Sequence, residues 1–360
     1  MQMKLSIIIC VYNEERYISE CIESLHLADH PQWEAIVVND ASTDTTLDII
    51  ELFARKHTNL RCYSLTHNMR LGNARNFAIM LASGEYIAFL DADDYIDAAV
   101  LAEKLRMIDA GTDVLINGHS RLYDHGPSTI AIESGEFSGH AAACLYLRRK
   151  FGTWGSCIHI YRRDHVLRNN CLFASGFYYE DVVFCFKALC TAGKVIADPT
   201  PFYVYRCNND GITRGNAATP LHLMSSARLH FDLVHILQTK PEDDKLRVAF
   251  ARAFNILTEE HLPRMIKSLQ QGMHEKSLEF FGEFMHYIKC CDTPFSRDVL
   301  AVIQSQSCNK KFTYSNDAGF RYHRFWRIAS PLRKTVIWIS RVLTRMKVKV
   351  LNRPEKDRSG

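Results

Sequence analysis

Short apolar runs alternate with segments of helical periodicity through the first quarter of the chain. The runs expected as strands are residues 5–11, 35–38, 61–65 and 86–90. Apolar residues that recur three or four positions apart predict helices over residues 18–25, 47–53 and 75–82. Continuous apolar runs are typical of strands buried on both faces, and strand–helix alternation predicts a mostly parallel sheet with right-handed crossovers. The sequence therefore predicts an α/β fold for this region.

Polar side chains stand where three of the expected strands end. Asn13 follows the first strand, Asp40 the second and Asp91 the fourth. Ligands of parallel sheets bind in the crevice beyond the carboxyl ends of the strands. We therefore expect these three residues to converge on one binding crevice.

The acidic segment after the fourth strand reads Asp91-Ala92-Asp93-Asp94. If it continues in an extended conformation, Asp91 and Asp93 project from the same face and repel each other unless a cation lies between them. Oxygen ligands suit Mg²⁺ or Mn²⁺, which complete their shell with water and substrate phosphates. The alternative is an acidic turn that caps a helix beginning near Asp97. These residues alone leave both interpretations open.

Four segments resemble, in this order along the chain, motifs of the family 2 inverting glycosyltransferases. They are residues 5–14, Val37–Asp44, Asn68–Asn76 and Asp91–Asp93. Asn39, Ala41 and Arg70 depart from the family pattern, and Ala41 and Arg70 occupy common glycine positions. The resemblance implies a GT-A fold, which is a Rossmann-like, mostly parallel sheet that binds nucleotide-diphospho-sugars.

The resemblance also implies roles for individual residues. Asp40 would hydrogen-bond the nucleotide base, usually uracil, and Asp91 and Asp93 would hold the Mn²⁺ or Mg²⁺ cofactor. The set expected to bind the donor is Val11, Asn13, Asp40, Arg75, Asp91, Arg206 and Arg214. Gly211 and Gly215 would let the loop around Arg214 close over the nucleotide, and the two arginines would supply charge to the departing diphosphate.

Glu180-Asp181 resembles the family's Glu-Asp motif at a helix start, which implies that Asp181 is the general base. An acceptor hydroxyl is a weak nucleophile until its proton is removed. The alternative is that both carboxylates merely complement the positive end of a helix. On the acceptor side we expect Trp154, Tyr179 and Glu180, since aromatic faces stack on sugar rings.

Composition narrows the protein class. The twelve cysteines show no paired short spacing of a zinc site, and the chain has no cleavable signal before its first strand, so reduced thiols in the cytoplasm are expected. No glycine fingerprint for a dinucleotide follows the first strand, which argues against a dehydrogenase. We expect a catalytic domain over residues 1–216, a helical extension over residues 217–330 and a basic amphipathic tail over residues 331–360.

The tail concentrates the positive charge of the chain. Residues 318–360 contain twelve Lys or Arg and two acidic residues, whereas the whole chain has a net charge of +4. No apolar run reaches the roughly 18 residues needed to span a bilayer. We expect peripheral attachment to the anionic inner face of the cell membrane; a solvated helix and nucleic-acid binding are the weaker alternatives.

The expected activity is metal-dependent, inverting transfer of a sugar from a nucleotide-diphospho-sugar, expected to be a UDP-sugar. The expected acceptor is a hydroxyl of a glycan or lipid-linked molecule in bacterial surface polysaccharide or lipopolysaccharide synthesis. Two alternatives stay open. A nucleotidyltransferase would release pyrophosphate, and a membrane-associated scaffold with a decayed site would bind nucleotide sugar without turnover.

Overall fold

A computed structural model describes residues 4–123, 126–130, 132–148, 155–176 and 178–207, together with the single positions 225, 229, 232, 233, 236 and 246. The chain divides into two compact units, residues 1–217 with 232–254, and residues 218–231 with 255–360. The expected helical extension and basic tail lie outside the described ranges, so both stay predictions, as does Arg214.

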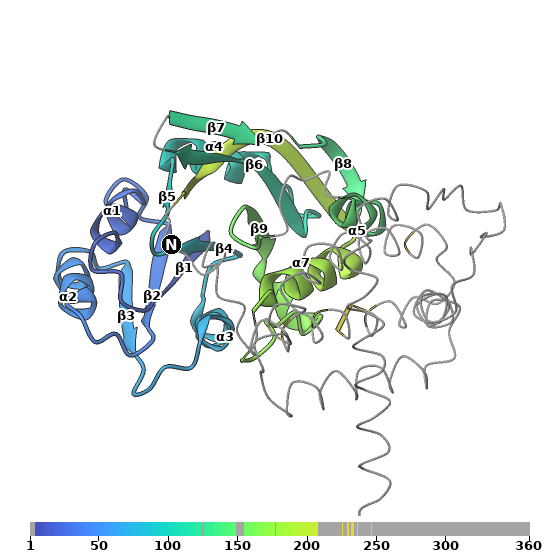
Figure 1. The fold of residues 1–360 in the computed structure, drawn as a ribbon. Coiled ribbons are helices and arrows are strands. Elements are labelled where there is room, and N and C mark those ends of the chain that lie inside the picture. Colours follow the sequence, from blue (N-terminus) through green and yellow to red (C-terminus); the bar gives the residue numbers. More distant parts are fainter. Residues whose placement is uncertain are drawn as a thin grey trace, which may run out of the picture. The chain divides into compact units, whose positions relative to one another are not determined.

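The first unit is built on one ten-stranded sheet (Figure 1). Its strands are β1 (Leu5–Val11), β2 (Trp33–Asn39), β3 (Leu60–Ser64), β4 (Tyr86–Asp91), β5 (Tyr95–Ile96), β6 (Val114–Tyr123), β7 (Gly126–Ile130), β8 (Gly135–Ser138), β9 (His159–Arg162) and β10 (Lys194–Arg206). The spatial order is β3-β2-β1-β4-β9-β6-β10-β5, with β7 beside β6 and β8 beside β10. The α/β prediction is confirmed.

The four strands expected from the sequence form the parallel part of the sheet. β1 lies between β2 and β4, and β2 pairs with β3, all in parallel register. Every residue of β1 and β2 is buried, in keeping with their apolar sequences. The second part of the sheet departs from this pattern because β9 runs antiparallel between β4 and β6.

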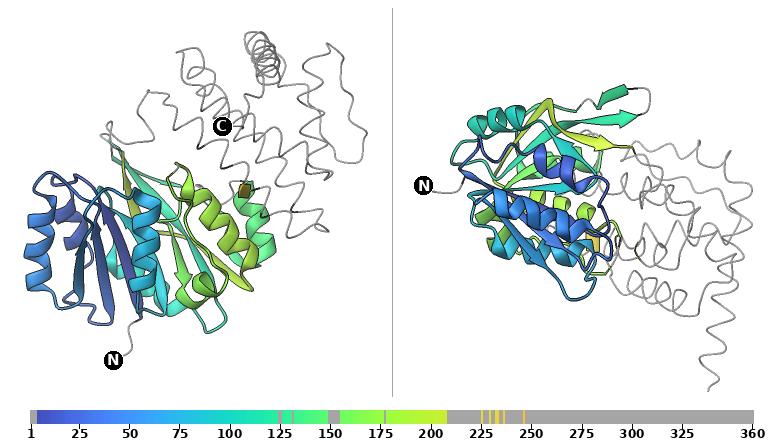
Figure 2. Two further views of the ribbon diagram at one scale, coloured as in Figure 1. Left: turned by 90° about the horizontal axis from the view of Figure 1, so that it is seen from below. Right: turned by 90° about the vertical axis from the view of Figure 1, so that its left-hand side faces the viewer.

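Helices cover the sheet on both sides. They are α1 (Ile18–Glu23), α2 (Thr46–Lys56), α3 (Leu71–Leu81), α4 (Ala98–Met107), α5 (Gly139–Leu147), α6 (Arg163–Arg168) and α7 (Glu180–Thr191). The parallel strands lie between α2 on one side and α3 on the other (Figure 2). None of the helices in the described ranges is long and apolar enough to cross a membrane.

An aromatic core joins the two parts of the sheet to α7. Phe89 of β4 contacts Tyr161 of β9, Phe173 and Phe184 edge-on, and the rings of Phe173 and Phe184 stack with centroids 4.1 Å apart. Offset and edge-on pairs of this kind stabilise a core beyond their buried area. This packing fixes the start of α7 relative to β4, which matters because both carry candidate site residues.

Candidate active site

The ends of β1, β2 and β4 meet, as the sequence predicts. In the sheet register Cys10 lies opposite Asp91, and Val11 lies opposite Asn39. The backbone N–H of Asp40 donates to the carbonyl of Val11 at 2.8 Å. The crevice expected at this edge is therefore formed by adjacent strand ends.

Asn13 holds the loop after β1 to the loop after β2. Its Oδ1 accepts a hydrogen bond from the Thr43 backbone at 2.8 Å, and its own N–H donates to Ser42 Oγ at 3.0 Å. Asn13 has a φ of 56°, a left-handed conformation that asparagine adopts more readily than most residues. Asn13 thus shapes the crevice through its backbone and its amide.

Asp40 is buried at the floor of this crevice, with 4% of its surface exposed. Its Oδ1 accepts a hydrogen bond from the Met69 backbone N–H at 2.6 Å. Within the described ranges no donor reaches its second oxygen. The carboxylate is therefore held through one oxygen.

The acidic segment after β4 turns instead of continuing as a strand. The Asp94 N–H donates to the Asp91 carbonyl at 3.0 Å, so the expected extended conformation is wrong. The turn still gathers the carboxylates, since the charges of Asp91 and Asp93 act on both Glu14 and Asp94. The helix cap of the alternative interpretation is supplied by Asp97, whose Oδ1 accepts from the Val100 N–H at 3.0 Å.

Burial and the crowding of negative charge around the turn raise the pKa values of two carboxyl groups, those of Glu14 and Asp94. Burial, followed by the charge of Asp93, raises the pKa of Glu14 to about 7. Burial, followed by the charges of Asp91 and Asp93, raises the pKa of Asp94 to about 8. Like charges held this close favour either protonation or a bound cation. The turn is thus an electrostatically unfavourable place for further negative charge unless a cation binds.

Asp94 is tied down from β10. Tyr203 Oη donates to its Oδ2, and the backbone N–H of Arg206 donates to its Oδ1 at 2.7 Å. Because protein donors occupy both oxygens, Asp94 holds the turn in place and is less available to a ligand. Sequence reasoning missed this role, although Asp94 stands in the acidic motif itself.

Arg75 lies buried at the centre of the site, with 3% of its surface exposed. Its Nη2 donates to Asp91 Oδ1 at 2.7 Å, and its Nη1 donates to Glu180 Oε1 at 3.1 Å. The guanidinium also lies over the Phe173 ring, 5.1 Å from the centroid. The sequence predicts that Arg75 binds the nucleotide-sugar donor. In the structure, Arg75 joins the acidic turn to the start of α7.

The Cys157 thiol completes the environment of Asp91. Its Sγ donates to Asp91 Oδ2 at 3.3 Å and lies 3.7 Å from Arg75 Nη2. Nothing in the cysteine spacing indicated this contact, because the two residues are 66 positions apart.

Glu180 and Asp181 begin α7, and Tyr179 precedes them in a left-handed conformation with a φ of 65°. Burial, followed by the charge of Asp181, raises the pKa of Glu180 to about 7 against the opposing effect of Arg75. Burial likewise raises the pKa of Asp181, while Arg75 and the backbone N–H of Ser156 oppose the rise. Among the acceptor-side residues, Trp154 lies outside the described residues.

Arg206, at the end of β10, contacts the backbone of the acidic turn. Its Nε donates to the Asp93 carbonyl at 3.0 Å and its Nη2 to Glu20 Oε2 at 2.7 Å. The guanidinium lies over the rings of Tyr17 and Tyr95, 5.0 and 5.4 Å from their centroids. In this conformation Arg206 supports the Asp93 backbone, so its predicted contact with a diphosphate requires these bonds to rearrange.

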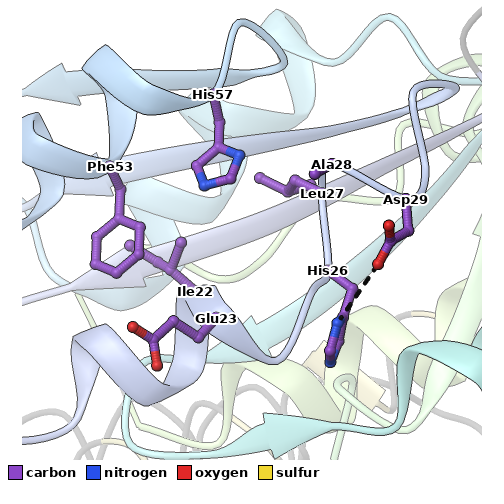
Figure 3. Close-up of a pocket in the computed structure, with 8 residues that line it drawn as sticks. All are labelled: Ile22, Glu23, His26, Leu27, Ala28, Asp29, Phe53 and His57. Carbon is purple, nitrogen blue, oxygen red and sulfur yellow. Dashed lines mark ion pairs between the residues drawn. The ribbon is translucent and has the colours of Figure 1, made fainter.

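A separate pocket of about 180 Å³ opens between α1 and α2 (Figure 3). His26 and Asp29 form an ion pair of 3.7 Å on its rim, and Phe53 and His57 of the α2 end line its other side. None of the predicted donor, metal or base residues lines it. We therefore assign the pocket no part in the site.

Comparison with known proteins agrees with this architecture. Residues 6–171 match the family model for "Glycosyl transferase family 2", a span that contains Asn13, Asp40, Arg75, Asp91 and Asp93. The chain is thus similar to glycosyltransferase family 2 over residues 6–171. Its match to this family ends before Asp181, so the role of Asp181 depends on the geometry described above.

Curated relatives align with part of the chain. It is 26% identical over 247 residues to the Escherichia coli uncharacterized glycosyltransferase YibD, with 66% of this chain and 69% of YibD aligned. It is 32% identical over 214 residues to the Staphylococcus aureus poly(ribitol-phosphate) beta-N-acetylglucosaminyltransferase TarS, 58% of this chain but 36% of TarS. The chain thus spans about a third of TarS.

The fold of the chain is also that of a solved structure. Residues 1–349 of S. aureus TarS, in complex with UDP-GlcNAc, superpose with a TM-score of 0.60 and 24% identity over 88% of this chain and 95% of that one. This likeness shows the fold, a GT-A α/β architecture.

Proposed function

We propose that the protein is an inverting transferase that moves a sugar from a UDP-sugar to a hydroxyl of a glycan acceptor. The observation that carries the proposal is the position of Arg75, whose two arms bond Asp91 of the acidic turn and Glu180, the neighbour of Asp181. One buried guanidinium thereby joins the acidic turn, which could hold a diphosphate through a bound cation, to the helix start that carries Asp181.

Asp181 is the proposed general base. Its raised pKa makes the carboxylate a stronger proton acceptor than an exposed aspartate. The Ser156 N–H orients the carboxylate, so that it can take the proton of the acceptor hydroxyl as the oxygen attacks the anomeric carbon. Attack from the face opposite the diphosphate inverts the anomeric configuration.

The residues of the acidic turn fit a divalent cation of the Mg²⁺ or Mn²⁺ type. Asp93 would hold it, because its carboxylate lies in the crowded acidic group and hard cations prefer such oxygens. Asp91 would join as a second ligand only in exchange for a protein contact, because its two oxygens accept from Arg75 and Cys157. Within the described ranges no group of three ligand side chains is arranged around a metal position. An ion held by so few carboxylates would complete its shell with diphosphate oxygens and water, and when bound it would stabilise the leaving diphosphate.

Uracil is the proposed base of the donor nucleotide. The second oxygen of Asp40 can accept a hydrogen bond, and uracil presents an N–H at the ring position where cytosine presents a lone pair. TarS, of similar fold, is solved with UDP-GlcNAc and with UDP, which supports the same donor class here. Val11, Asn13 and Arg75 are further residues proposed to bind the donor.

We expect Asp40→Asn to weaken UDP binding by roughly 10- to 100-fold, the effect of losing one charge-assisted hydrogen bond. The asparagine oxygen can still accept from Met69, so the fold is retained. Calorimetry measures the affinity of wild type and of Asp40→Asn for UDP and for CDP. Wild type should prefer UDP, and the variant should lose that preference; an unchanged UDP affinity in Asp40→Asn would remove Asp40 from the base site.

The acceptor class follows from the relatives. TarS acts on poly(ribitol-phosphate), and the putative glycosyltransferase EpsH of Bacillus subtilis is 29% identical over 219 residues, 62% of its length. We propose a glycan or lipid-linked acceptor of bacterial surface polysaccharide synthesis. Lipopolysaccharide assembly is one such pathway.

We also propose that residues 331–360 attach the protein to the cytoplasmic face of the cell membrane through their basic charge. Deletion of this tail should abolish cosedimentation with vesicles containing anionic phosphatidylglycerol and leave the weak association with neutral vesicles unchanged. Equal binding of the deleted and intact chains to anionic vesicles would refute the attachment.

A further inference from the structure

Arg70 has a backbone conformation that glycine usually supplies. It stands immediately before α3 with a φ of 68° and a ψ of 155°. This region of backbone space is essentially restricted to glycine, because any Cβ clashes with the neighbouring peptide. Strain of this kind persists only where the surrounding structure holds the residue in place. The presence of arginine at a position that favours glycine therefore needs a structural explanation.

The Arg70 side chain reaches a segment more than one hundred positions away. Its Nη1 donates to the Gly176 carbonyl at 3.2 Å, while the rest of the residue is exposed. Gly176 has a φ of 78° and belongs to the segment that leads into Glu180 and Asp181. We call residues 173–176 the base loop.

Two residues of α3, Asn73 and Asn76, also hold the base loop. Asn76 Nδ2 donates to the Phe173 carbonyl and its Oδ1 accepts from the Phe173 N–H, both at 2.9 Å. Ser175 Oγ donates to Asn73 Oδ1 at 2.6 Å. These contacts hold the beginning of the base loop, and Arg70 adds a contact at its last residue, Gly176.

Close backbone approach makes the junction tight. A Cβ added to Gly72 would lie 2.7 Å from the Ala174 carbonyl oxygen, a distance that real Cβ atoms do not show. The first turn of α3 is therefore in direct contact with the base loop. On its other side, the residue before Arg70 is Met69, whose N–H donates to Asp40.

We propose that Arg70 is a positioning residue that holds the base loop, and through it Asp181, relative to the donor site. The proposal rests on the proposed function for its catalytic consequence. The guanidinium ties the Gly176 carbonyl to the segment that orients Asp40, and backbone strain is the cost of placing an arginine at this point. Arg70 thus acts on the acceptor step through Asp181 and leaves nucleotide binding to other residues.

The test separates the strain from the side chain with three variants. Arg70→Gly removes both, Arg70→Ala removes the guanidinium and keeps the strain, and Ala41→Gly is the matched control. Ala41 also has a positive φ, 61°, at a common glycine position of the family. We expect Arg70→Gly and Ala41→Gly each to raise Tm by about 2–4 °C, since glycine relieves the backbone strain.

Hydrogen exchange and kinetics then decide the role of the side chain. Amide exchange in residues 173–176 should be about tenfold faster in Arg70→Gly and Arg70→Ala and unchanged in Ala41→Gly. Both Arg70 variants should lose roughly three- to tenfold in kcat, with the Kd for UDP within twofold of wild type. A kcat loss without a change in Kd is the signature of displaced Asp181.

Wild-type exchange and wild-type kcat in Arg70→Gly would overturn the proposal, and so would a lower Tm in Arg70→Gly than in Arg70→Ala. The outcome is separable from the proposed function. If wild type releases UDP from no donor, the transferase proposal fails, whereas the exchange of residues 173–176 still decides whether Arg70 holds the base loop.

Discussion

Asp181→Asn is expected to lower kcat by about 100- to 10,000-fold, the usual contribution of a general base. Asparagine has nearly the same shape and can still accept from the Ser156 N–H, so the fold and the donor site should be retained. The measurement is steady-state transfer from a UDP-sugar, with UDP affinity determined separately by calorimetry. UDP affinity should stay within a few-fold of wild type.

The matched control for this variant is Asp164→Asn. Asp164 lies on α6, pairs with Arg168 at 2.8 Å, and has 68% of its side chain exposed. Its substitution should leave kcat unchanged. A kcat for Asp181→Asn within threefold of the Asp164→Asn value would exclude Asp181 as the base.

The pH dependence of wild-type kcat follows from the same group. A base acts when deprotonated, and burial raises the pKa of Asp181, so kcat should fall as the pH decreases, at a pH above the ordinary aspartate pKa of about 3.9. The charge of Asp91 adds to this rise, so Asp91→Asn should move the acid limb to lower pH. An acid limb that stays in place would show that the two carboxyl groups titrate independently.

Arg75→Ala is the substitution with the largest expected effect on stability. It leaves Asp91 and the buried Glu180 without their shared cation, and breaking a buried ion pair in this way costs about 3–5 kcal/mol of unfolding free energy. Chemical denaturation monitored by circular dichroism measures this loss. Arg75→Lys should recover part of it, since lysine keeps the charge but cannot bond both carboxylates in the same fork geometry.

Arg55→Ala provides the matched control for Arg75→Ala. Arg55 forms an i,i+4 pair with Glu51 at 3.5 Å on α2, and 73% of its side chain is exposed. Exposed pairs of this kind contribute at most about 0.5 kcal/mol. Equal losses for the two variants would contradict a central role of Arg75 in joining the acidic turn to α7.

Local sequence patterns were sufficient for the parallel half of the fold. β1, β2 and β4 are continuous apolar runs buried on both faces, and polar residues after them necessarily meet at one edge. The antiparallel insertion of β9 was not predictable, because strand order in the second half depends on pairing between distant segments.

The contacts between the site residues could not be predicted from the sequence either. Arg75 and Glu180 are 105 positions apart, and no periodicity relates them. Arg206 illustrates the same limit, since sequence reasoning pointed its charge at the diphosphate while the structure engages it with Glu20 and the Asp93 carbonyl. The departures from glycine at Ala41 and Arg70 did carry a signal, because both have a positive φ.

The measurement that tests the central claim most directly is release of UDP from a panel of nucleotide sugars, with Mn²⁺ or Mg²⁺ and a membrane lipid extract as acceptor source. The account predicts release from one or a few UDP-sugars by wild type, strong loss in Asp93→Ala and Asp181→Asn, and retention in Asp164→Asn. Release of pyrophosphate instead, or binding of UDP without turnover of any donor, would contradict it.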